Sequence, residues 1–328
     1  MSPLGVPNID SQLEVELLAD MQKVESLLRS HIEGDYPLVV ETSRHLVQAG
    51  GKRLRPLLTL ISAQFGDPSK FGIIEAAVVC ELTHLATLYH DDVMDEAPLR
   101  RGVESANNRW GNSVAILTGD YLFAKASDLL ADLGPEAVRL QAKTFERLVI
   151  GQINETQGSS TGVSAIDHYL NVVSDKTASL IATSARFGAL LSGANQKVVE
   201  LLTQFGEKVG IAFQIADDLL DVQSNSTESG KTPGTDLKEG VPTLVTLYAM
   251  NSTDPKDADL IERLKKPITD GEIAKTINEL RNHKSVQEVK AYLRKIADEA
   301  DEILSQLPAG AAKDALANLI TALISRSA

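Results

Sequence analysis

The chain has 328 residues and a formal net charge of −13. This acidic balance argues against nucleic acid as a partner, because binding to it needs a basic surface, and against electrostatic attachment to anionic lipid. The sequence has no run of about 18 uncharged apolar residues and no basic-then-apolar leader at its start, so we expect a cytoplasmic protein without stable membrane insertion. Its single cysteine, Cys80, excludes an internal disulfide.

The apolar composition favours helices. Hydrophobic residues make up 43% of the chain and aromatic residues only 4%, with Leu, Ala, Ile and Val dominating. From Ser11 to Ser30 the apolar residues recur at helical spacing, and similar patterns return almost to the C-terminus. We therefore predict an all-α protein in which residues 1–328 form a single large domain around a deep central cavity.

Glycine and proline mark the expected helix boundaries. They fall at Gly50-Gly51, Gly66-Asp67-Pro68, Pro98, Gly134-Pro135, Gly158 to Gly162, Gly230 to Gly240, Pro255 and Pro308-Gly310. The stretch 223–240 is the most polar and glycine-rich of these breaks. We interpret it as a mobile lid or a loop that contacts phosphate.

Two basic segments flank the first acidic cluster of the chain. Gly50-Gly51-Lys52-Arg53-Leu54-Arg55-Pro56 precedes it, and Arg100-Arg101-Gly102 follows it. A lysine binds phosphate through a compact positive charge, and an arginine can donate two parallel hydrogen bonds to it. Paired glycines allow the backbone to approach an anion closely. Alone, each segment is typical of a solvated basic turn, but beside an acidic cluster the pair indicates a phosphate site.

The acidic pattern DDxxD occurs twice, as Asp91-Asp92-Val93-Met94-Asp95 and as Asp217-Asp218-Leu219-Leu220-Asp221. On a helix the first and fifth residues lie about one turn apart on the same face, and their like charges cost roughly a few tenths of a kcal/mol each. Because bound cations would offset this repulsion, the repeated motif indicates a binding site for hard divalent cations. Mg²⁺ takes one or two carboxylates and completes its shell with water and substrate phosphate oxygens. We therefore expect a diphosphate between two acidic helices.

Six segments in order resemble the trans-isoprenyl diphosphate synthases, also called polyprenyl synthetases. They are GGKRLRP, ELTHLATLYHDDVMD, RRGVESANNRWGN, DKTASL, FQIADDLLD and GKTPGTDLKEG, and the match covers roughly residues 40 to 250. The resemblance implies a homodimer with the isoprenoid synthase type I fold. It also implies head-to-tail condensation of isopentenyl diphosphate onto an allylic diphosphate.

The resemblance implies a role for each matching position. Isopentenyl diphosphate is expected to bind Lys52, Arg55, His84 and Arg101, and the allylic diphosphate is expected to bind Arg100, Lys176 and Lys231, with Lys238 nearby. Mg²⁺ is expected on Asp91, Asp95 and Asp217, whereas Asp92, Asp218 and Asp221 act through water or support a ligand. The catalytic set is Lys176, Thr177 and Gln214, of which the last two turn oxygens toward the developing allylic cation.

The chemistry of the reaction agrees with these roles. Ionisation of an allylic diphosphate needs stabilisation of the departing charge, which Mg²⁺ and basic side chains provide. No Ser-His-Asp or Cys-His pattern offers a conventional base, and the family resemblance implies that the departing diphosphate takes the proton. Without the motif, His84 would be typical of a core histidine.

Product length depends on residues one to two turns before Asp91, which we expect to line the cavity under the growing chain. Thr83, Ala86 and Thr87 are small, whereas short-chain members of the family carry a bulky aromatic floor. We therefore predict a long product, heptaprenyl to decaprenyl, of the kind used for quinone side chains. A deeper floor at Leu122 or Phe123, or one from a partner subunit, would instead give a short-chain geranylgeranyl or farnesyl diphosphate synthase.

Two further interpretations stay open. A class I terpene cyclase also ionises an allylic diphosphate with Mg²⁺, but it usually carries an Asn/Ser/Glu motif in place of a second DDxxD. An inactive subunit of a heteromeric synthase normally loses carboxylates or the GGKR segment. Both are less consistent with this sequence, in which every motif is intact.

Overall fold

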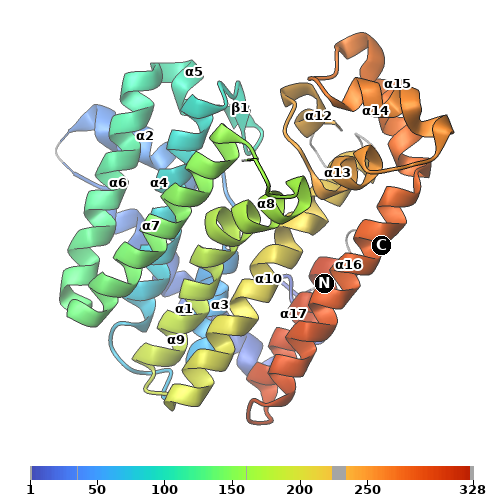
Figure 1. Cartoon of the computed structure of the whole chain (residues 1–328). Helices are drawn as coiled ribbons and strands as arrows, with labels where there is room; N and C mark the ends of the chain where they lie inside the picture. The colour runs from blue at the N-terminus through green and yellow to red at the C-terminus, as the bar shows by residue number, and fades with distance from the viewer. Residues whose placement is uncertain (1, 35, 160, 224–233, 326–328) are drawn as a thin grey trace. The chain divides into compact units, whose positions relative to one another are not determined.

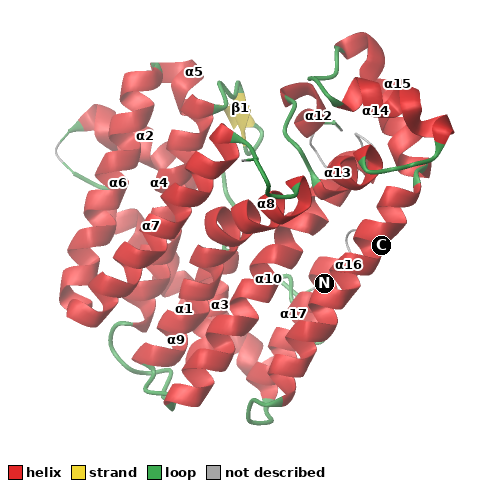
Figure 2. Cartoon of the chain, viewed as in Figure 1, coloured by secondary structure: helices red, strands yellow, loops and turns green. Residues whose placement is uncertain are grey.

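The computed structural model describes residues 2–34, 36–159, 161–223 and 234–325. Nearly every element in these ranges is a helix, as Figure 2 shows by colour. The exceptions are two short antiparallel strands, β1 (Leu99–Arg100) and β2 (Val103–Glu104). The prediction of an all-α fold is confirmed.

The chain divides into two compact units, whose helices are labelled in Figure 1. The first unit contains α1 (Ser11–His31), α2 (Pro37–Gln48), α3 (Leu54–Ala63), α4 (Ile73–Met94), α5 (Ala106–Trp110) and α6 (Asn112–Leu133). The second contains α8 (Ala165–Val172), the π-helix η1 (Val173–Ala178), α12 (Thr235–Glu239), α13 (Leu244–Met250), the 3₁₀-helix η2 (Pro255–Asp257), α14 (Ala258–Leu264), α15 (Asp270–Asn282) and α16 (Lys284–Ser305).

Four of the borders between the units fall inside helices, namely α7 (Pro135–Gln157), α9 (Ser179–Leu191), α10 (Gln196–Gln223) and α17 (Ala311–Ser325). The fifth lies between residues 306 and 307, after the end of α16. A single domain over residues 1–328 with a deep central cavity stays a prediction. The two hollows found in the first unit, of about 350 and 420 Å³, include none of the predicted site residues.

Local sequence signals account for where the helices begin. Asp10 caps α1, because its carboxylate accepts hydrogen bonds from the backbone N–H groups of Gln12 and Leu13, both at 3.0 Å. The helix predicted over Ser11 to Ser30 is thereby confirmed. None of the described helices combines the length and apolar character that crossing a membrane requires.

Helix α4 is a largely buried helix of the first unit, and it carries the first acidic motif at its C-terminal end. It packs against α6, where Gly119 removes the side chain that would otherwise collide with His90. A Cβ on Gly119 would also lie 3.0 Å from the carbonyl oxygen of Ala86. The glycine therefore lets the two helices approach closely along the turn before Asp91.

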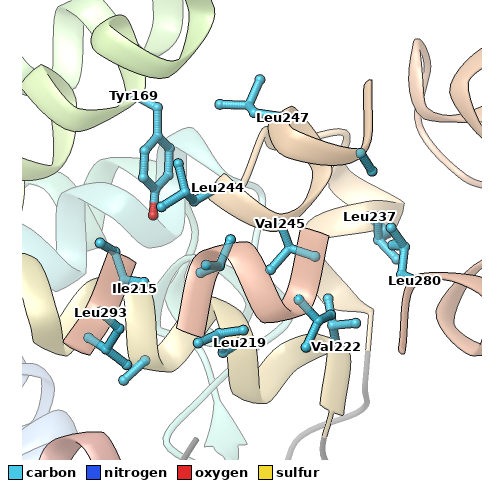
Figure 3. Packing of buried hydrophobic residues seen from close by; sticks show 14 of the residues in the cluster. Tyr169, Ile215, Leu219, Val222, Leu237, Leu244, Val245, Leu247, Leu280 and Leu293 are labelled. Atoms are coloured by element: carbon cyan, nitrogen blue, oxygen red, sulfur yellow. The ribbon is translucent and has the colours of Figure 1, made fainter. Parts of the chain in front are cut away.

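The second unit has its own apolar core around the last turns of α10. Ile215, Leu219 and Val222 on that helix are almost fully buried and pack in one cluster with residues of α13 and α16. Figure 3 shows this cluster, including the ring of Tyr169 from α8. Burial of this apolar face fixes how α10 is oriented in the unit, and with it the carboxylates of the second acidic motif.

Candidate active site

Arg53, in the loop before α3, forms ion pairs within the protein. Arg53 has a left-handed backbone with φ of 48° and is only 9% exposed. Its guanidinium contacts two carboxylates, with Nε 2.5 Å from Oε1 of Glu25 and Nη1 2.9 Å from Oε1 of Glu81. These ion pairs and a bond to the carbonyl of Val47 hold the loop in which the flanking Lys52 lies. Arg53 had no role in the sequence prediction, because its partners are distant in the chain.

Arg101 is placed by the paired glycines. Its Nη1 donates to the carbonyl of Leu46 at 2.9 Å and to that of Gly50. A Cβ on Gly51 would lie 3.0 Å from the guanidinium carbon of Arg101, so the arginine rests directly against this glycine. Gly50 and Gly51 also have φ of 90° and 150°, a backbone region that other residues rarely adopt. The glycine pair therefore positions an arginine that is predicted to bind substrate.

A two-residue turn delivers the second basic pair. Arg100 in β1 pairs with Val103 in β2, and the residues between them, Arg101 and Gly102, have φ of 53° and 78°. Two consecutive positive φ values are the geometry of a type I′ hairpin turn. The short hairpin therefore presents two neighbouring arginines from one rigid element.

Positive charge concentrates around His84. Burial lowers the pKa of His84 well below 6.5, and the nearby charges of Arg55, Arg101, Arg100 and Arg53 lower it further. Burial also lowers the pKa of Arg55, an effect opposed by Glu81. The imidazole is therefore neutral near pH 7, and four arginines act on one half-buried position. Protein carboxylates balance part of this charge, because Arg53 pairs with Glu25 and Glu81 and Arg100 pairs with Asp92. A bound anion would relieve the rest.

The first acidic motif separates into exposed and buried carboxylates. Asp91 and Asp95 lie at the C-terminal end of α4, half-buried and exposed respectively, where the helix dipole adds negative potential. Asp92 is fully buried, and its Oδ1 accepts from Nε of Arg100 at 2.5 Å. Burial raises the pKa of Asp92, while Arg100 opposes that shift. Asp92 thus anchors Arg100, whereas Asp91 is half-buried and Asp95 is exposed.

The π-helix η1 carries two of the predicted catalytic residues. Lys176 pairs with Glu155 of α7, with Nζ 2.5 Å from Oε2, and the Thr177 hydroxyl donates to Oε1 of Gln214 at 3.2 Å. A Cβ on Gly151 of α7 would lie 2.6 Å from the backbone nitrogen of Lys176. Single π-turns within helices frequently occur at functional sites. The structure therefore brings Thr177 to Gln214, whereas the ammonium group of Lys176 pairs with Glu155.

The second acidic motif crowds carboxylates at the end of α10. Burial raises the pKa of Asp218 to about 6, and the charges of Asp217 and Asp221 add to the shift. Asp236, at the start of α12, has a pKa raised to about 8 by burial and by the charges of Asp218, Asp221, Glu239 and Asp217. The sequence prediction gave Asp236 no role, although it lies within the segment GKTPGTDLKEG.

These carboxylates suit a hard divalent cation. Burial is the main cause of their raised pKa values, and repulsion between the carboxylates adds to it. A bound cation would relieve that repulsion, and carboxylate oxygens are the ligands such ions prefer. Within the ranges that the structure describes, no three His, Cys, Asp or Glu side chains are grouped as a ready metal site. Mg²⁺ needs only one or two protein carboxylates beside water and phosphate.

The structure describes only one of the two lysines in the predicted phosphate loop. Lys231 lies outside the described residues. Lys238 forms an ion pair with Asp270, at 2.6 Å between Nζ and Oδ1, on the surface of the second unit. That the two acidic helices face each other across a cavity mouth stays a prediction.

Comparisons with known proteins agree on one family. The family model described as polyprenyl synthetase matches residues 36–280. The chain is 46% identical over 324 residues to nonaprenyl diphosphate synthase of Mycobacterium tuberculosis (strain ATCC 25618 / H37Rv), covering 98% of this chain and 97% of the relative. It is 36% identical over 299 residues to heptaprenyl diphosphate synthase component 2 of Bacillus subtilis (strain 168), covering 91% and 85% of the two chains.

A solved structure gives the same result. Geranylgeranyl pyrophosphate synthase from Corynebacterium glutamicum, complexed with calcium and isoprenyl diphosphate, superposes with a TM-score of 0.87 at 42% identity. The alignment covers 97% of this chain and 98% of that one. Similarity of sequence and of fold therefore extends over nearly the whole chain.

Proposed function

Because the chain belongs to the polyprenyl synthetase family, we propose that it is an all-trans-polyprenyl diphosphate synthase. It condenses isopentenyl diphosphate head-to-tail onto an allylic diphosphate such as farnesyl or geranylgeranyl diphosphate. The observation that carries this proposal is the group of Arg55 and Arg101 near the neutral His84, together with Arg100, which the buried Asp92 holds. Long products, heptaprenyl to decaprenyl, are supported by the similarity to the nonaprenyl and heptaprenyl relatives.

Each diphosphate has its own basic groups in this proposal. Isopentenyl diphosphate binds Lys52, Arg55, His84 and Arg101, and the allylic diphosphate binds Arg100, Lys176 and Lys231. The buried Asp92 holds the guanidinium of Arg100 in place, so this arginine meets the diphosphate with little loss of side-chain freedom. Neutral His84 donates a hydrogen bond without adding charge to a site already crowded with arginines.

Asp91, Asp95 and Asp217 would hold Mg²⁺, which when bound stabilises the negative charge of the departing diphosphate. The C–O bond of the allylic diphosphate breaks, and the double bond of isopentenyl diphosphate forms a new C–C bond to the allylic carbon. One proton then leaves, and the family resemblance assigns it to the released diphosphate. Thr177 and Gln214 turn oxygens toward the cation while it exists.

Divalent metal binding is supported by the calcium complexed in the Corynebacterium structure, and Mg²⁺ by the chemistry of the carboxylates. A homodimer in the cytoplasm remains part of the proposal. A short-chain product is the second candidate, favoured by the similarity to the geranylgeranyl pyrophosphate synthase of Corynebacterium.

One incubation tests the function and separates the candidates. Purified protein, Mg²⁺ and farnesyl diphosphate are mixed with labelled isopentenyl diphosphate, and the products are separated by chain length. A ladder ending well beyond geranylgeranyl supports the long-chain enzyme, and a ladder stopping there supports the short-chain one. No incorporation of label would refute the synthase and favour the cyclase or the inactive subunit.

A further inference from the structure

Four polar side chains of the second unit form one continuous chain of hydrogen bonds. The hydroxyl of Tyr169 donates to Oδ2 of Asp218, and Nε2 of Gln214 donates to Oδ1 of the same carboxylate at 2.9 Å. At the other end, the hydroxyl of Thr177 donates to Oε1 of Gln214 at 3.2 Å. The chain joins α8, α10 and the π-helix η1.

The chemistry of this chain selects one orientation of the Gln214 amide. An ionised carboxylate only accepts hydrogen bonds, so Asp218 must receive the amide NH₂ group. The amide oxygen then points the opposite way, toward Thr177. With an apolar residue at position 218, no acceptor would select the NH₂ end, and the Gln214 amide could adopt either orientation.

Tyr169 restricts the carboxylate itself. Asp218 and Tyr169 are only 4% and 8% exposed, and the tyrosine ring packs in the apolar cluster with Ile215 and Leu219 (Figure 3). Because the tyrosine hydroxyl occupies Oδ2, Oδ1 remains directed at Gln214, one helical turn earlier on α10. Packing of the Tyr169 ring in the apolar core therefore restricts the orientation of the Asp218 carboxylate.

We propose that Tyr169 and Asp218 are positioning residues that hold the Gln214 amide with its oxygen toward the allylic cation. This inference rests on the proposed function, in which the oxygens of Gln214 and Thr177 face that cation. A reversed amide would present its positive NH₂ end instead and would oppose ionisation. Tyr169 contacts neither substrate nor metal in this scheme and acts only through Asp218 and Gln214.

The test is a double-mutant cycle on kcat for condensation. Tyr169→Phe keeps the ring and removes the hydroxyl, and we expect kcat to fall about 10-fold, with KM for both diphosphates changed less than about 2-fold. In a Gln214→Leu background the same change should cause no further fall, because the group it acts through is gone. Equal falls in both backgrounds, or an unchanged kcat in Tyr169→Phe, would overturn the inference.

Two further measurements separate positioning from general stability and from the proposed function. Tyr248→Phe is the matched control, since Tyr248 packs against the same cluster, and it should leave kcat unchanged. The side-chain amide resonances of Gln214, assigned by their loss in Gln214→Leu, should shift or broaden in Tyr169→Phe. If they do not change, the inference fails even when the enzyme is active. If they change but the native protein condenses nothing, only the proposed function fails.

Discussion

Lys176 and Glu155 form an ion pair in which Nζ lies 2.5 Å from Oε2. The lysine is expected to bind the allylic diphosphate, so the carboxylate of Glu155 competes with substrate for the same ammonium group. Both side chains are partly exposed, at 24% and 32%, and such a pair contributes about 0.2 to 1 kcal/mol.

Replacing Glu155 by glutamine should therefore lower KM for the allylic diphosphate. We expect a decrease of about 2- to 5-fold, the equivalent of losing one partly exposed ion pair. Steady-state kinetics with farnesyl diphosphate as the varied substrate measure it. Glu299→Gln is the control, because it breaks the Lys208–Glu299 pair, of similar length and exposure. A raised KM in Glu155→Gln would instead mean that the carboxylate positions the lysine.

The metal assignment predicts severe effects at two aspartates. Asp91→Asn and Asp217→Asn each replace a charged ligand by a neutral one of equal size, and kcat should fall by about 100-fold or more. The dependence of rate on Mg²⁺ concentration should also move to higher concentration, and a chelator should abolish the activity of the native protein. Asp128→Asn, at an exposed position of α6, is the control and should change neither quantity. A normal Mg²⁺ dependence in either variant contradicts the assignment.

Gly210 allows α10 to lie against the π-helix that carries Lys176 and Thr177. A Cβ on this glycine would lie closer to the Cα of Ala178 than van der Waals contact permits. We expect Gly210→Ala to destabilise the protein by about 1 to 3 kcal/mol and to lower kcat, because backbone must move. Thermal unfolding and condensation rates measure the two effects.

Gly271 provides the matched control, since it lies in α15 with nothing within 4 Å of an added Cβ. Gly271→Ala should be neutral or stabilising by up to about 1 kcal/mol, because alanine is the better helix former. Equal melting temperatures for the two alanine variants would show that the contact at Gly210 is not restrictive.

The chain-length hypothesis predicts a shorter product for Ala86→Phe. Ala86 is fully buried on α4, in the turns before Asp91, and its carbonyl oxygen lies near Gly119. If this part of α4 lines the prenyl shaft, the ring will act as a floor, and the product ladder will end at least one unit earlier. Met94→Phe adds a ring on the same helix at a 51% exposed position and should leave the ladder unchanged. A destabilised Ala86→Phe variant with unaltered products would place Ala86 in helix packing alone.

Cys80 should report unfolding rather than catalysis. It is fully buried, and burial raises the pKa of its thiol to about 12. At pH 8 the folded protein therefore holds the thiol protonated and out of reach of an aromatic disulfide reagent. We expect no reaction in the native state and one thiol per chain in denaturant. Rapid labelling of the folded enzyme would contradict the burial of this residue.

Sequence patterns were sufficient for the fold class and the family. The helical period over Ser11 to Ser30 and the glycine and proline breaks describe local backbone preferences, which act within a few residues. Six ordered motifs identified a family that the comparisons confirm. The enzyme class is likewise confirmed, whereas the individual site residues stay predictions.

Patterns did not reveal which charged residues are anchors. The family resemblance already set Asp92 and Asp218 apart from the metal ligands, but it did not show which residues they hold. Both are buried and hydrogen-bonded to residues of other elements. Arg53 stands beside Lys52 in one basic string, but its guanidinium faces two glutamates. Burial and pairing of this kind depend on tertiary contacts, which one-dimensional spacing does not contain.

The sequence by itself determined the helical architecture and the supply of carboxylates, arginines and lysines for a diphosphate, because these follow from composition and from periodicity of 3.6 residues. Only the tertiary structure decided how those groups divide between holding substrate and holding each other. Arg53 meets Glu81 across 28 residues, and Tyr169 meets Asp218 across 49. Such partners are chosen by the packing of helices, which brings distant side chains into water-poor contact where an unpaired charge is costly.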